Sequence, residues 1–215
     1  MPKTVLPAHQ ERSRKTLARL LQAAVETLNR DGLEGATIPR IAARAGLTPG
    51  AIYRRFPDKD ALLREVCLRA LESNYRHTSE LLNPEKWNDK SLADICGYVI
   101  DTTLKGHAQH RGLLRALTLF TLQHPDASFV RRSEELEWKT FQLVSEMLLT
   151  RRDEIRHPDP DSAIRCAMLM IGVVAQGVMV LPKDPRHFSR LLPDAENQVQ
   201  RELPRMVLQY LGIGK

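Results

Sequence analysis

Cysteine is scarce in this sequence, and its three cysteines lie far apart. Cys67, Cys96 and Cys166 form no CxxC pair among 215 residues. A small disulfide-stabilised scaffold needs a denser set of cysteines, and a structural zinc site needs closely spaced ligand pairs. The spacing therefore disfavours both classes and fits a protein kept in a reducing compartment.

Residues that favour strands are also few, and no apolar run is long. Valine and isoleucine number 12 and 9 against 31 leucines, which favours helices over sheets. The longest apolar run, residues 166–181, has 16 residues and includes Gln176, so it is too short to span a bilayer comfortably. Residues 1–15 lack the apolar segment of a signal peptide. We expect an all-α, soluble, cytoplasmic protein without a membrane partner.

Positive charge, in contrast, is concentrated in the first third of the chain. Residues 1–63 carry 11 Lys and Arg against 6 Asp and Glu, a net charge of +5, whereas the other 152 residues carry 21 against 20, a net of +1. A concentrated basic region is typical of modules that bind nucleic-acid phosphates. A solvated charged surface without a ligand is the plainer interpretation.

Two short helical patterns separated by a glycine lie inside this basic region. The first starts at Thr37, a predicted N-cap, and has apolar residues at helical spacing up to Ala45. Gly46 supplies the left-handed residue that ends a helix without strain. Thr48 and Pro49 then suit the cap and the first position of a new helix. Two helices joined in this way predict a helix-turn-helix, whose second helix fits the DNA major groove.

The periodicity divides the rest of the chain into further helices. We expect a flexible basic tail at 1–10, a helix-turn-helix domain at 11–72 and a larger helical domain at 73–215. Pro204 predicts a kink or a break in the last helix. The predicted helices are 11–31, 37–45, 48–55, 58–82, 91–108, 110–123, 126–152, 161–181 and 194–211.

The helix-turn-helix region resembles the tetracycline-repressor (TetR) family of bacterial transcription regulators. The resemblance is close over residues 11–72, and beyond them only the helical pattern and the length agree. It implies an N-terminal three-helix DNA-binding domain joined by a long helix to a C-terminal ligand-binding and dimerisation domain. It also implies a homodimeric repressor that releases a palindromic operator when a small molecule binds the C-terminal domain. The residues that carry it are Ile41, Ala42, Ala45, Gly46, Gly50, Ile52, Tyr53, Phe56, Lys59, Leu62 and Leu63.

The same resemblance assigns DNA contacts by position. Gly50 and Ala51 have almost no side chain, so base reading by hydrogen bonds is sparse and the operator sequence does not follow from the chain. Tyr53 has a second interpretation as a core residue of the motif, and Arg44 as a solvated charge. The implied contact residues are Thr37, Arg40, Arg44, Thr48, Pro49, Gly50, Ala51, Tyr53, Arg54, Arg55 and Lys59.

The larger helical domain offers two more candidate sites. Large or adaptable side chains between its helices are candidates for an apolar ligand pocket, although core packing explains each of them as well. The 161–181 helix is apolar on nearly all sides, which predicts contact with a second copy; burial within one monomer is the alternative. The pocket candidates are Tyr98, His107, Phe120, Trp138, Phe141 and Met168, and the interface candidates are Ile171, Val174, Val178, Val199 and Met206.

Two other functions stay open. The sequence has no GxSxG, glycine-rich phosphate loop or HExxH motif, yet an all-helical enzyme with scattered catalytic residues remains one alternative. An architectural DNA-binding protein without an effector is the other. His107 and His110 have the spacing of a metal-binding pair but lack a third ligand, so we predict neither a metal nor a cofactor.

Overall fold

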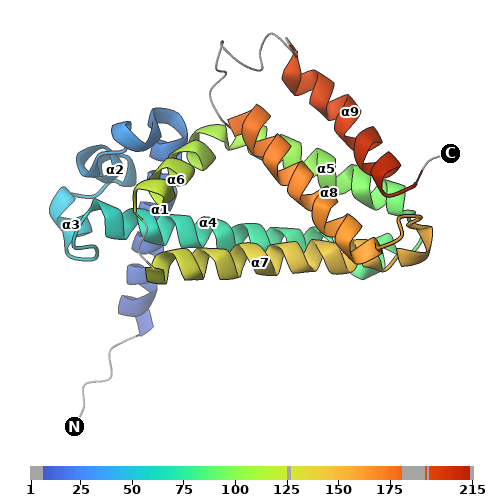
Figure 1. The fold of residues 1–215 in the computed structure, drawn as a ribbon. Helices are drawn as coiled ribbons and strands as arrows, with labels where there is room; N and C mark the ends of the chain where they lie inside the picture. Colours follow the sequence, from blue (N-terminus) through green and yellow to red (C-terminus); the bar gives the residue numbers. More distant parts are fainter. Residues whose placement is uncertain (1–6, 125–126, 181–191, 193, 214–215) are drawn as a thin grey trace. The chain divides into compact units, whose positions relative to one another are not determined.

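The computed structural model describes residues 7–124, 127–180, 192 and 194–213, and every regular element within them is a helix (Figure 1). The predicted all-α class is therefore confirmed. The α-helices are α1 (Pro7–Gly35), α2 (Ile38–Ala45), α3 (Pro49–Tyr53), α4 (Lys59–Leu81), α5 (Leu92–Gln109), α6 (Arg111–Gln123), α7 (Ala127–Leu149), α8 (Pro160–Ala175) and α9 (Ala195–Tyr210), with short helices η1 (Pro84–Trp87), η2 (Arg152–Glu154) and η3 (Gln176–Val180) between them.

The helix ends differ from the predicted ones at both ends of the chain. The first helix begins at Pro7, so residues 7–10 of the predicted tail are helical, while residues 1–6 lie outside the described part. This helix is interrupted at Gly32, whose φ of 70° is in the left-handed region that glycine adopts without strain. Helix α9 continues through Pro204, so the predicted break is absent.

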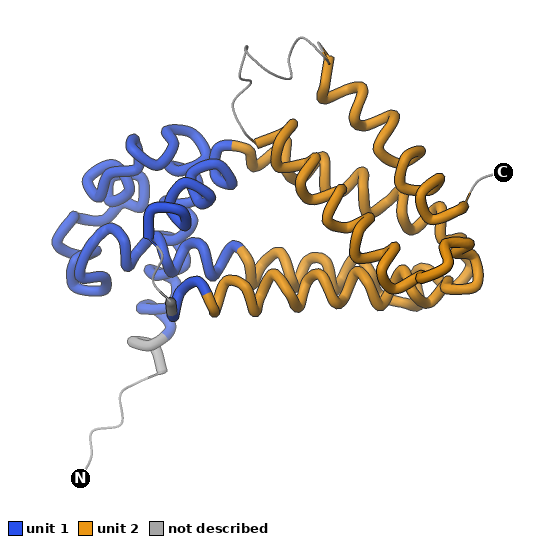
Figure 2. Tube along the Cα trace, viewed as in Figure 1, with its two compact units in different colours: residues 1–70, 112–130 blue, residues 71–111, 131–215 orange. Residues whose placement is uncertain are grey.

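The chain divides into two compact units, which Figure 2 shows in different colours. Unit 1 comprises residues 1–70 and 112–130, and unit 2 comprises residues 71–111 and 131–215. The predicted division after residue 72 differs from this one in residues 112–130, which group with the N-terminal helices. Unit 1 therefore contains the basic helices α1 to α3 together with most of α6.

Helix α6 is held against α1 inside unit 1 by a close backbone approach. The Leu113 N–H donates to Asn29 Oδ1 at 3.1 Å. A Cβ atom at Gly112 would lie 2.0 Å from the backbone carbonyl oxygen of Asn29, far inside van der Waals contact. Further along α6, Phe120 is 1% exposed and packs edge-on against Phe129. A glycine is therefore required where the two helices meet.

Helices α5, α8 and α9 pack against one another in unit 2 (Figure 1). Helix α8 buries Ile164 and Ile171, but Leu169 and Val173 are 66% and 62% exposed, so it is not covered on every side. The segment Pro160–Val180 is long and apolar enough to span a membrane by length and composition, in contrast to the shorter run read from the sequence. The apolar character of this segment has two sources. One side of α8 packs in the core, and another side lines the pocket described below.

The three cysteines occupy different environments. Cys67 and Cys96 are buried, and Cys166 on α8 is exposed. Burial raises the pKa of the Cys96 thiol to about 12, and the nearby Glu154 carboxylate adds to the effect. Cys96 therefore stays a neutral thiol in the core.

Candidate functional site

The predicted helix-turn-helix is formed by α2, a glycine turn and α3 in unit 1. Gly46 has a φ of 61°, and its N–H donates to the Ala43 carbonyl at 3.1 Å. Thr48 Oγ1 accepts a hydrogen bond from the Ala51 N–H at 3.2 Å, which confirms the predicted cap. The turn and the start of α3 are therefore fixed by local contacts.

Thr37 takes the predicted N-cap position of α2, but its side chain makes no capping hydrogen bond. An N-cap side chain bonds to the amide of the second or third helical residue. The second residue here is Pro39, which has no N–H. Pro39 thus removes one of the two possible donors, and no cap forms to the other, so the predicted role of Thr37 as a side-chain cap is wrong.

The residues implied to contact DNA gather on the outside of this motif. The apolar stripe of α2 and Ile52 are buried beneath them. Tyr53 is 53% exposed, so its ring is not packed in the motif core. Thr37, Arg40, Arg44, Thr48, Pro49, Gly50, Tyr53, Arg54 and Arg55 are exposed, and Ala51 and Lys59 are half-buried; these eleven residues are called the motif surface below.

The arginines of the motif surface differ in how they are held. The Arg55 Nη2 donates to Ser13 Oγ at 2.9 Å. Arg40 and Arg44 approach acidic residues of α1 only at 4.0 and 3.9 Å, and exposed pairs of this kind contribute little. Within the described part of the chain, the guanidinium group of Arg54 makes no hydrogen bond or ion pair, and only its backbone N–H is bonded, to the Gly50 carbonyl at 3.2 Å. Arg54 is therefore well placed to bind an external anion.

Lys59 is used within the protein as well as at its surface. Its Nζ donates to the Leu33 carbonyl at 2.8 Å, in a partly buried position. Lys59 is the first residue of α4. In this first turn, Asp58 Oδ1 accepts a hydrogen bond from the Ala61 N–H at 2.7 Å. A phosphate contact at this position would therefore come from the backbone at the helix N-terminus rather than from a free ammonium group.

Replacing Lys59 with alanine is expected to lower the free energy of unfolding by about 1 kcal/mol, because the Leu33 carbonyl loses a charged donor. Urea unfolding followed by circular dichroism measures this difference. Lys139, an exposed lysine on α7, provides the matched control, and Lys139→Ala should leave the unfolding free energy nearly unchanged. Equal unfolding curves for both variants would contradict the structural role of Lys59.

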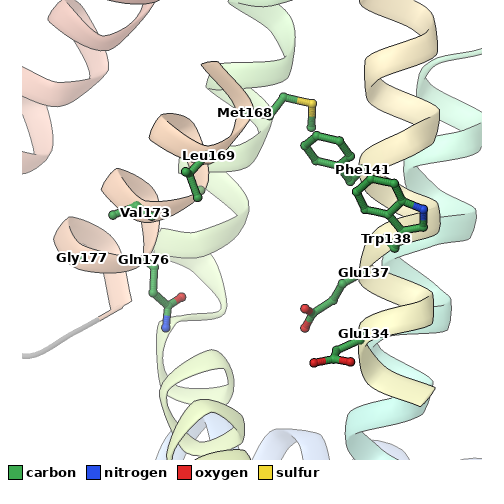
Figure 3. Close-up of a pocket in the computed structure, with 10 residues that line it drawn as sticks. Glu134, Glu137, Trp138, Phe141, Met168, Leu169, Val173, Gln176 and Gly177 are labelled. Carbon is green, nitrogen blue, oxygen red and sulfur yellow. The ribbon is translucent and has the colours of Figure 1, made fainter. Parts of the chain in front are cut away.

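A second candidate site is an open pocket of about 690 Å³ between α7 and α8, within unit 2 (Figure 3). The α7 wall consists of residues three or four apart, so they share one helix face. The opposite wall comes from α8 and η3. The α7 residues are Glu134, Glu137, Trp138 and Phe141, and the opposite residues are Met168, Leu169, Gly172, Val173, Gln176 and Gly177.

Three of the six predicted pocket residues line this pocket together. The rings of Trp138 and Phe141 stack with centroids 5.2 Å apart and an interplanar angle of 15°, and Met168 faces them across the pocket (Figure 3). Glu134 and Glu137 also line the pocket but were not predicted from the sequence. Charged residues on a helix usually mark its solvent face, and only their spacing relative to Trp138 could have indicated the pocket.

The other three predicted pocket residues lie elsewhere. Phe120 is in the core of unit 1, because its side of α6 packs inward. Tyr98 packs against Trp87, with ring centroids 4.8 Å apart. His107 Nδ1 lies 2.8 Å from the Thr103 carbonyl oxygen. Burial lowers the pKa of His107, and this hydrogen bond only partly opposes the effect, so the ring is neutral near pH 7.

The predicted interface residues are not equally available to a second copy. Ile171 is 6% exposed within its own unit, so it lies on the packed side of α8 and offers little surface to a partner. Val174, Val178 and Val199 are half-buried. Met206 on α9 is 60% exposed, and it is the best placed of the five to meet a partner.

Comparison with known proteins relates the motif region to one family. Residues 20–66 match the model of the bacterial regulatory proteins of the tetR family. The HTH-type transcriptional regulator BetI of Escherichia coli O157:H7 is 29% identical over 162 residues, which cover 72% of this chain and 78% of BetI. The HTH-type transcriptional regulator YvdT of Bacillus subtilis (strain 168) is 27% identical over 96 residues, or 45% of this chain. That match spans only 47% of YvdT, about half its length.

The whole fold also has solved counterparts. A TetR-family transcriptional regulator from Mesorhizobium loti superposes with a TM-score of 0.70, covering 94% of this chain and 98% of the other. The two sequences are 18% identical, so this similarity concerns the fold alone. The family match thus covers residues 20–66, whereas the similarity of fold covers nearly the whole chain.

Proposed function

Because this chain belongs to the tetR family of bacterial regulatory proteins, we propose that it is a cytoplasmic transcriptional regulator that binds a palindromic DNA operator. The observation that carries the proposal is the motif surface. Helices α2 and α3 bury their apolar side chains within unit 1 and leave Tyr53 and Arg54 exposed to solvent. These residues lie beside a turn whose geometry suits entry into a major groove. Repression is the mode that we propose for it.

The charge distribution supports DNA as the partner. The net charge of +5 in residues 1–63 attracts phosphates without regard to sequence, and contacts at base edges then add specificity. A palindromic operator matches a two-fold protein, with recognition helices about 34–36 Å apart in successive major grooves. We therefore propose a homodimer formed through α8 and α9, with Met206 at its interface.

We propose that a small molecule in the α7–α8 pocket controls DNA binding. The pocket volume of about 690 Å³ lies in the range of drug-sized ligand sites. The relatives BetI and YvdT are named as transcriptional regulators, which favours a binding protein over the helical enzyme considered above. The pocket favours an effector-controlled regulator over an architectural DNA-binding protein.

Arg54→Ala is expected to weaken DNA binding about tenfold at moderate salt, because a charge-assisted phosphate contact is lost in each subunit. The slope of log affinity against log salt should become shallower by about 2, since each lost contact reduces it by about 0.9. Fluorescence anisotropy measures both quantities with a duplex that the purified protein has selected from random DNA.

Arg115→Ala is the matched control for this experiment. Arg115 is an exposed arginine of unit 1 outside the motif surface, so the net charge change is the same. Its slope should remain that of the unsubstituted protein. Identical slopes for Arg54→Ala and Arg115→Ala would contradict the contact, and failure of the protein to select any sequence would overturn the proposed function.

A further inference from the structure

Two carboxylates that line the α7–α8 pocket have no ion-pair partner among the residues that the structure describes. The side-chain carboxylates of Glu134 and Glu137 make no hydrogen bond or ion pair with any described residue. Glu135, between them in sequence, is paired with Arg132 at 3.2 Å on another side of α7, and Arg132 also approaches Glu72 at 3.9 Å. Arg132, two residues before Glu134, therefore pairs with carboxylates outside the pocket.

The two pocket carboxylates also affect each other. Partial burial and the like charge of Glu134 both raise the pKa of Glu137. Both carboxylates are drawn on the α7 wall and point into the space opposite Gln176 (Figure 3). A positive charge placed beside them would relieve their repulsion, whereas an anion would add to it.

The aromatic pair lies next to these carboxylates on the same helix face. Trp138 is 54% exposed despite its size, and its ring stacks on Phe141. A cation over an indole face is attracted by the ring quadrupole. Farther along the pocket, Met168 is oriented by a contact of 3.4 Å between its sulfur and Ser145 Oγ. The pocket thus has an acidic end and an apolar end.

We propose that the α7–α8 pocket binds a lipophilic organic cation, with the positive charge beside Glu134 and Glu137 and the apolar body against Trp138 and Phe141. The inference rests on the proposed function, in which this pocket is the effector site. A second copy of the chain is a poorer occupant, because it would bury two unpaired carboxylates. Charge complementarity selects a cation over an anion of equal size.

Tetraphenylphosphonium and tetraphenylborate test this directly, because they have nearly the same size and shape but opposite charge. Isothermal titration calorimetry of the full chain should show the phosphonium binding at least about tenfold more tightly. The double substitution Glu134→Gln and Glu137→Gln should remove most of this preference, mainly by weakening phosphonium binding. Glu135→Gln, which removes one charge from α7 outside the pocket, should retain it.

Three results would overturn the inference: equal affinities for the two ions, tighter borate binding, or an unchanged preference in a double variant whose thermal unfolding is normal. Failure of both ions to bind would also overturn the inference. If Trp138→Ala then converts a dimer into a monomer in sedimentation, a second copy occupies the pocket. DNA selection by the unsubstituted protein would be unaffected in each case. A failure of the cation site is therefore distinguishable from a failure of the proposed regulatory function.

Discussion

Replacing Gly112 with alanine is expected to lower the free energy of unfolding by about 3 kcal/mol, at the upper end of the range for overpacked sites. The added Cβ would lie 2.0 Å from the Asn29 carbonyl oxygen, which is a backbone atom and cannot rotate away. Moving α6 outward would break the hydrogen bond between the Leu113 N–H and Asn29 Oδ1. The packing of α6 on α1 is therefore lost, whether the clash remains or α6 moves outward.

Urea unfolding of the full chain measures this loss, and Gly106→Ala is its control. Gly106 is also helical, on α5, and a Cβ there would meet nothing within 4 Å. Its replacement should raise the unfolding free energy by about 0.5–1 kcal/mol, because alanine is the better helix former. If the two variants shift the midpoint in the same direction, the close approach of α6 to α1 is not as described.

Replacing Met206 with aspartate is expected to weaken operator binding by about 100-fold or more. Met206 is 60% exposed on α9, so the substitution should leave the fold of the monomer intact while placing a charge in the proposed dimer interface. A dimer that holds both half-sites gains about 10²–10⁴ in affinity through linkage of the two contacts. A monomer loses that gain even with an intact motif surface.

Sedimentation velocity and fluorescence anisotropy together test this prediction. Met206→Leu keeps an apolar side chain of similar volume and should behave as the unsubstituted dimer in both measurements. Normal thermal unfolding of Met206→Asp would establish that the monomer is folded. A dimeric Met206→Asp with full DNA affinity would place the interface elsewhere on the chain.

The elements that could be predicted from sequence are those fixed by local chemistry. Gly46, Thr48 and Pro49 determine the turn through backbone conformation and capping, which depend on a few neighbouring residues. Helix α2 and the start of α3 were therefore predicted to within one residue. Thr37 makes no side-chain cap, and the neighbouring proline, itself visible in the sequence, removes one of the two amides that such a cap can use.

The features that could not be predicted depend on long-range packing. Gly112 gives no local sign that it meets Asn29, so the grouping of residues 112–130 with the N-terminal helices was missed. Phe120 was predicted to line a pocket because a large aromatic side chain suits an apolar ligand site. In the structure its face of α6 points into the core of unit 1, where Phe120 is buried. Glu134 and Glu137 were missed for the same reason, since periodicity does not say which helix lies opposite.

The distribution of thiols has a practical consequence. With Cys67 and Cys96 buried and Cys166 exposed, a maleimide dye should label the folded chain at one site without any engineered cysteine. That site lies on α8, and the proximity of Cys166 raises the pKa of Tyr210 on α9. The emission of a single fluorophore attached there would therefore report changes in the local environment between α8 and α9 while DNA or ligand is added.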